Sequence, residues 1–124
     1  MFYRITIFLS ILTLSVIFLT GCGDVEAVQV SDDGTIDIVL DEWNITPKNI
    51  KVKKGQTVTF NVKNEGETNH NYTIQTLKGT SNIARRGVSE KLIVTFEKTR
   101  KYKVHCSIKG HAAKGQVGQI IVEE

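Results

Sequence analysis

The sequence predicts an all-β protein, a Greek-key β-sandwich of about seven to eight strands. Three observations lead to this prediction. Runs in which apolar and polar residues alternate recur along the chain, turn residues such as Gly, Asn and Asp separate them, and none has a helical period. Thr, Val and Ile are also abundant, which favours strands. We expect the strands to pair in antiparallel fashion.

The predicted strands follow one another at short intervals. In the first of them Ile36, Ile38 and Leu40 share one face, which predicts that this face lies in the core. Residues 78–89 are expected to form a long connection with room for one helical turn. The predicted strands cover residues 35–40, 50–52, 56–62, 71–77, 91–96, 100–106 and 119–122.

Length and charge limit the possible functions. A chain of 124 residues makes one domain. Its formal net charge of +3 is small, and its cationic residues are spread along the chain, so we expect no nucleic-acid partner. We expect the protein to be a monomer.

The N-terminal residues are expected to be a secretory signal. A start with one positive charge, at Arg4, precedes an uncharged apolar run over residues 5–19. The phrase Leu19-Thr20-Gly21-Cys22 resembles the lipobox of bacterial lipoproteins. That resemblance implies cleavage before Cys22 and attachment of lipid, such as palmitate, to this cysteine.

These observations divide the chain into three parts. We expect residues 1–21 to be a lipoprotein signal peptide, residues 22–34 a lipidated cysteine and tether, and residues 35–124 the folded domain. The alternative is an uncleaved membrane anchor, since the apolar run is near the lower limit for a span. In both cases the domain lies outside the cytoplasm, attached to the cell membrane.

The residues that carry chemistry lie near the C-terminus. A predicted strand ends at Cys106, His111 follows five residues later, and Gln116 follows after five more. A thiolate and imidazoles with a weak axial group suit copper. His105 is adjacent to Cys106 on a strand and points to the opposite face, so His70 is the natural second imidazole.

The spacing Cys-x4-His-x4-Gln and the phrase Gly-His-Ala-Ala-Lys-Gly, residues 110–115, resemble the copper loop of cupredoxins, most closely the rusticyanin and sulfocyanin kind. The stretch at residues 55–66 is similar to the earlier half of that family, and the resemblance covers residues 35–122. It implies one type 1 copper ion. The implied ligands are Cys106, His70 and His111, and Asn71 and Ser107 match positions that hydrogen-bond across the two ligand loops.

Two residues depart from the family pattern. Gln116 occupies the axial position, where the family usually has Met and where stellacyanin-like proteins have Gln. An amide oxygen favours Cu(II) more than a thioether does, so we expect a reduction potential below that of Met-ligated relatives. Lys109 replaces the Pro that often precedes the Gly-His pair.

The sequence therefore favours a membrane-anchored one-electron carrier in an extracytoplasmic redox chain, with His111 as the expected exit for the electron. A redox partner such as a cytochrome or oxidase is expected to dock near His111, Lys109 and Lys114. The alternatives are a copper-binding scavenger, storage or delivery lipoprotein, and a zinc site. We do not expect an enzyme, because the chain's three His cannot supply the several metal sites of multicopper oxidases.

Overall fold

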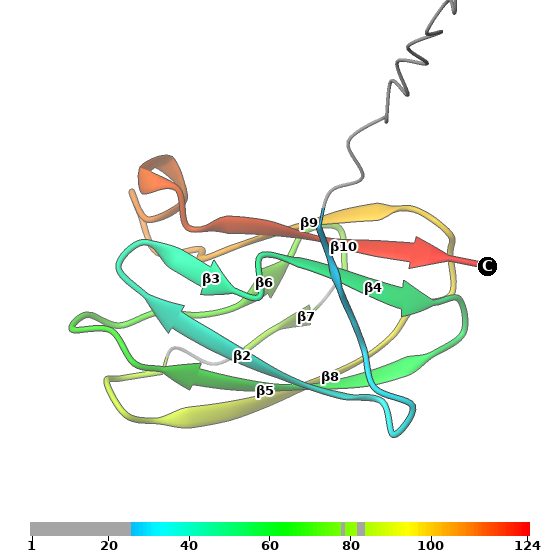
Figure 1. Cartoon of the computed structure of the whole chain (residues 1–124). Helices are drawn as coiled ribbons and strands as arrows, with labels where there is room; N and C mark the ends of the chain where they lie inside the picture. The colour runs from blue at the N-terminus through cyan, green and yellow to red at the C-terminus, as the bar shows by residue number, and fades with distance from the viewer. Residues whose placement is uncertain (1–25, 78, 82–83) are drawn as a thin grey trace, which may run out of the picture.

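A computed structural model of the chain describes residues 26–77, 79–81 and 84–124. In this part of the chain two β-sheets form a sandwich, one six-stranded in the order β1-β4-β10-β9-β6-β7 and one four-stranded in the order β3-β2-β5-β8 (Figure 1). The strands are β1 (Val28–Gln29), β2 (Thr35–Asp41), β3 (Asn44–Thr46), β4 (Asn49–Lys53), β5 (Thr57–Asn64), β6 (Thr73–Ile74), β7 (Gly79–Thr80), β8 (Ser89–Thr95), β9 (Lys101–His105) and β10 (Val117–Glu123). The predicted all-β sandwich is confirmed.

The expectation of purely antiparallel pairing is wrong. Strand β2 pairs with β5 in parallel, and β4 pairs in parallel with both β1 and β10. Parallel neighbours require a crossover connection. Here β3 is followed by β4 in the other sheet, and the chain then returns to run alongside β2 as β5.

Three local predictions also differ from the structure. The strand expected at residues 71–77 shortens to β6, because the chain just before it pairs with Ala84 and Ser81 instead. The described part of the connection 78–89 contains β7 and the bridge at Ala84 in place of a helical turn. Val28 and Gln29, inside the expected tether at 22–34, form β1, and Val30 beside them is only 3% exposed, so this segment packs on the domain.

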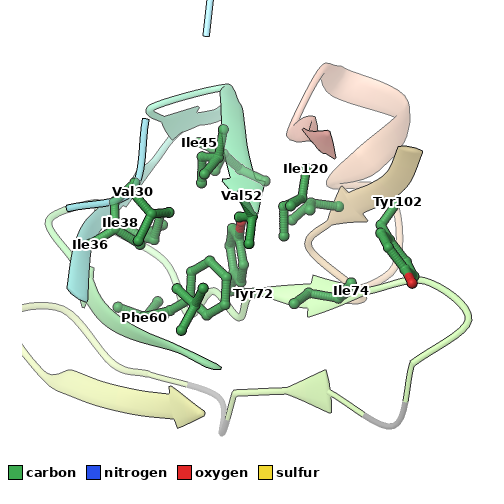
Figure 2. Close-up of a cluster of buried hydrophobic side chains, with 14 of the residues drawn as sticks. Val30, Ile36, Ile38, Ile45, Val52, Phe60, Tyr72, Ile74, Tyr102 and Ile120 are labelled. Carbon is green, nitrogen blue, oxygen red and sulfur yellow. The ribbon is translucent and has the colours of Figure 1, made fainter. Parts of the chain in front are cut away.

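Alternating apolar side chains from both sheets form the core (Figure 2). Ile36, Ile38 and Leu40 are buried, as the alternation predicts. The Phe60 ring packs against Tyr72, with centroids 5.4 Å apart. Burying each such side chain contributes roughly 1.5–3 kcal/mol. The strands that border the predicted metal loop, β9 and β10, bury Tyr102, Val104, Ile120 and Val122 in the same core.

Two segments lie together at one end of the sandwich, away from the C-terminus (Figure 1). One is the 3-10 helix η1 (Ala112–Lys114) between β9 and β10. The other is the turn that joins β2 to β3, residues 41–44, called here the β2–β3 turn.

The predicted signal peptide and Cys22 lie outside the described residues. Within residues 26–77, 79–81 and 84–124, no helix has the length and apolar character needed to cross a membrane.

Candidate metal centre

The loop between β9 and β10 carries three of the predicted ligands. Cys106 follows the last residue of β9, and its backbone N–H donates to the Gln116 carbonyl at 3.2 Å. The Gln116 N–H in turn donates to the His111 carbonyl, also at 3.2 Å. Gly110 and Gly115 have positive φ values of 86° and 109°, which residues other than glycine rarely adopt. These bonds and glycines close the loop so that its three side chains converge.

A second loop, between β5 and β6, delivers His70. The His70 backbone N–H and carbonyl both bond Ala84, at 3.1 and 2.8 Å. The buried Asn64 side chain holds the start of the loop, since its amide donates to the carbonyls of Thr68 and Ala84 at 2.7 Å and accepts from the Gly66 N–H at 2.8 Å. Loop and bridge together fix the backbone from which His70 projects.

The structure brings His70, Cys106 and His111 together. One nitrogen of each imidazole and the Sγ atom of Cys106 lie within 4.8 Å of one another. The Nδ1 atom of His111 is 3.5 Å from Cys106 Sγ and 3.2 Å from His70 Nδ1. His70 is 0% exposed, Cys106 1% and His111 8%, so His111 provides the edge that reaches the surface.

Gln116 lies beside this cluster and is fully buried. Its Nε2 donates to the carbonyls of Asp41 and Asn44 at 2.8 and 3.2 Å. Because these two bonds use the amide nitrogen, Oε1 is the atom turned to His70 Nδ1, at 2.9 Å. The amide therefore presents an oxygen, not a nitrogen, to the cluster.

A pair of hydrogen bonds joins the two loops. Asn71 Nδ2 donates to Ser107 Oγ at 2.7 Å, and the Ser107 N–H donates to Asn71 Oδ1 at 2.8 Å. The Asn71 N–H also points at Cys106 Sγ, 3.5 Å away. This arrangement ties the His70 segment to the Cys106 segment and gives the sulfur a donor.

The contribution of the β2–β3 turn was not predicted from the sequence. Glu42 Oε1 lies 3.0 Å from His70 Nε2. The Trp43 ring packs edge-on against His111, with centroids 4.7 Å apart, and is also covered by Lys114, whose Nζ is 4.0 Å from the ring centroid. The acidic-aromatic pair Glu42-Trp43 was the available signal, but nothing local connects it to ligands about 30 and 70 residues further on.

The remaining predicted positions lie around the cluster. Lys109 and Lys114 are exposed on the metal loop. His105 is half-buried and, with Lys48, Lys103 and Val117, lines a groove on the outer face of the six-stranded sheet. It therefore faces away from Cys106.

The donor set fits copper. A cysteine without a disulfide, two imidazole nitrogens and a fixed amide oxygen meet in a buried pocket. Two His and one Cys with a weak axial group make up the ligand type of blue copper sites. Among the described residues, this is the group of His, Cys, Asp or Glu that meets the geometry of a metal site.

Comparison with known proteins also indicates a copper-binding domain. The family model described as "Cupredoxin-like domain" matches residues 10–122. The copper-resistant cuproprotein CopI of Rubrivivax gelatinosus is 27% identical over 108 residues, which cover 71% of this chain and 66%, just under two thirds, of that protein.

Two solved structures share the fold. Auracyanin from Roseiflexus castenholzii is 21% identical with a TM-score of 0.69, over 73% of this chain and 98% of that one. The metal-binding domain of the Cu(I)-exporting ATPase CopA of Streptococcus pneumoniae D39 is 19% identical with a TM-score of 0.69, over 82% of this chain and 100% of that one. The predicted rusticyanin-like and stellacyanin-like subtypes stay predictions.

Removing the bond between the two loops tests its role. We expect Asn71→Ala to lower the free energy of unfolding by about 1–3 kcal/mol, since it removes two hydrogen bonds to the exposed Ser107 that contribute roughly 0.5–1.5 kcal/mol each, and to weaken metal retention. Urea unfolding and chelator competition measure the two effects. Asn61→Ala, which removes an exposed bond to Asp37, is the control. Equal losses in both variants would contradict the assignment.

Proposed function

Because the chain belongs to the cupredoxin-like domain family, we propose that it is a type 1 copper protein that carries single electrons. The cofactor is one copper ion, as the family and the donor set indicate. In the proposal His70, Cys106 and His111 hold it, and Gln116 is the axial ligand. The observation that carries the proposal is the convergence of the two imidazoles and the buried thiol, with one ligand atom of each within 4.8 Å of the others.

The residues around the site suit such a carrier. Bound copper supplies the exchange of one electron between Cu(I) and Cu(II). The chain holds three of the four proposed ligands by separate hydrogen bonds: His70 through Glu42, Cys106 through the Asn71 N–H, and Gln116 through two backbone carbonyls. Ligands held in this way keep their positions when the charge at the site changes.

The exposed edge of the site gives the proposed route for electrons. His111 is the proposed ligand with a surface-accessible edge, and Lys109 and Lys114 are exposed beside it. A basic rim of this kind steers an acidic partner. We therefore assign the docking position of a redox partner, such as a cytochrome or oxidase, to this end of a monomeric domain.

The proposed location is outside the cytoplasm, with lipid at Cys22 as the membrane anchor. The support is the lipobox-like phrase before Cys22. An anchored carrier stays close to membrane-bound donors and acceptors. The proposal therefore includes the N-terminal residues of the chain as well as the folded domain.

Copper handling is the second candidate function. It is favoured by the similarity to a protein named a copper-resistant cuproprotein. The buried donors argue against rapid delivery, since His70 and Cys106 are at most 1% exposed. Reversible reduction at an unchanged copper content separates a carrier from a scavenger or store.

The first prediction concerns the spectrum of the soluble form, residues 24–124, loaded with Cu(II). We expect an intense thiolate-to-copper band that bleaches with mild reductant and returns on oxidation, with the matching EPR signal. Cys106→Ser abolishes the band, whereas the control His105→Ala, one residue away on the opposite face, keeps it. A colourless protein, or a weak tetragonal copper band, would reject the carrier in favour of storage, delivery or zinc.

The second prediction concerns the axial position. We expect Gln116→Met to raise the reduction potential, because a thioether favours Cu(I) relative to an amide oxygen. A rise of about 59 mV corresponds to a tenfold change in relative affinity for the two oxidation states. Redox titration measures it, with Gln119→Met on β10 as the control. An unchanged potential in Gln116→Met would show that the amide does not ligate.

The third prediction concerns the anchor. We expect Cys22→Ser in the full chain to move the protein from the membrane fraction to the soluble fraction, since no lipid can be attached there. Fractionation with immunodetection measures the shift, and Cys106→Ser serves as the cysteine control that stays with the membrane. A Cys22→Ser protein that remains membrane-bound would indicate an uncleaved anchor.

A further inference from the structure

Glu42 stands out because it brings a negative charge to a fully buried imidazole. It lies in the β2–β3 turn of the four-stranded sheet, outside both ligand loops. The His70 side chain is 0% exposed and the Glu42 side chain 26% exposed, with Oε1 and Nε2 at 3.0 Å. A hydrogen bond to a charged group in such a sheltered place is stronger than one at the surface.

The carboxylate has a complete set of donors around it. Oε1 accepts from the Thr68 N–H and hydroxyl, both at 2.8 Å, and Oε2 accepts from the Glu67 N–H at 2.9 Å. The backbone N–H groups of Glu67 and Thr68 lower the pKa of Glu42 to about 2, with smaller contributions from the Thr68 hydroxyl and His70. The donors around both oxygens also require the ionised carboxylate, which only accepts hydrogen bonds.

The geometry also determines how His70 is used. Nε2 faces the Glu42 carboxylate and, at 3.3 Å, the Thr68 hydroxyl. Nδ1 faces His111 and the Gln116 oxygen, and it is the nitrogen that this arrangement offers to a metal. A metal-bound Nδ1 carries no hydrogen, so the hydrogen of the ring lies on Nε2, where the carboxylate can only accept it.

Gly66 provides independent support for a built arrangement. A Cβ atom at this position would lie 2.7 and 2.8 Å from the two Glu42 carboxylate oxygens and 2.8 Å from His70 Nε2. Such distances are far below van der Waals contact. The loop thus closes over the Glu42–His70 pair at the one residue type that leaves room for it.

We propose that Glu42 is the positioning residue of the metal centre: its carboxylate holds the His70 ring by Nε2, presents Nδ1 to the metal, and favours the oxidised, more highly charged ion. This inference rests on the proposed ligation by His70 and adds to it a residue that sets the potential. Carboxylate partners make a ligating imidazole more basic, and their loss typically costs 10–100-fold in metal affinity.

The test compares Glu42→Gln with Glu65→Gln. Both remove one negative charge, but Glu65 is exposed, pairs with Lys63 and has no bond to a proposed ligand. We expect Glu42→Gln to weaken Cu(II) binding 10–100-fold in competition titrations and to weaken Cu(I) binding less. Each tenfold difference between the two losses raises the reduction potential by about 59 mV. Equal affinities and potentials in the two variants would overturn the proposal.

A measurement on the metal-free wild type tests the assignment even where Glu42→Gln does not fold. In the metal-free wild type, ¹⁵N-edited NMR should show a slowly exchanging hydrogen on His70 Nε2, shifted downfield by the carboxylate. The signal should persist in Glu65→Gln and move upfield in Glu42→Gln. Gly66→Ala keeps the charge but crowds the pair, so it should move the signal and weaken metal binding. A wild-type His70 without a hydrogen on Nε2 would overturn the assignment.

The outcomes separate this inference from the carrier function. If the wild type lacks the thiolate-to-copper band, the carrier function is refuted. The positioning role can still be tested, by comparing the Cu(II) and Zn(II) affinities of the wild type with those of Glu42→Gln. If the wild type shows the band but Glu42→Gln changes neither the metal affinities nor the reduction potential, the carrier function stands and the positioning role is refuted.

Discussion

The contacts between the β2–β3 turn and the two ligand loops are the constraint on which the geometry of the centre depends. Glu42 binds His70, two backbone carbonyls of the turn bind the Gln116 amide, and Trp43 packs against His111. The turn belongs to the four-stranded sheet, whereas Gln116 and His111 lie next to strands of the other. Packing of the two sheets therefore sets the distances between the proposed ligands, and core and site are energetically coupled.

The two imidazoles occupy different environments. His70 is enclosed, bonded at Nε2 to a carboxylate, and has no exposed surface. His111 is 8% exposed and packs against an aromatic ring instead. An anionic partner at the enclosed ligand favours Cu(II) without placing the charge where a partner protein docks. The potential and the docking surface can thus vary separately within one site.

The sequence predicted what depends on local pattern, and the family resemblance added the distant pairs His70–Cys106 and Asn71–Ser107; distant contacts that neither specifies were not predicted. The alternation of apolar and polar residues predicted that Ile38 and Leu40 lie in the core. The close spacing of Cys106, His111 and Gln116 predicted that these residues share one loop. The role of Glu42 was not predicted, because its contact to His70 joins residues 28 positions apart. That contact depends on a parallel crossover, which the alternation of residues does not specify. Strand β1 was not predicted, because its two residues are too few to show an alternating pattern.

Trp43 connects the buried and exposed parts of the centre. Its ring lies edge-on to His111 and under the Lys114 ammonium group, so it excludes water beside the imidazole while part of it remains accessible. A cation over an aromatic face at an exposed site such as this is stabilised by about 0.5–1 kcal/mol. This contact restrains one of the two loop lysines next to the exposed ligand. The basic rim is therefore partly ordered before any partner arrives, and its position is determined by the same turn that holds His70 and Gln116.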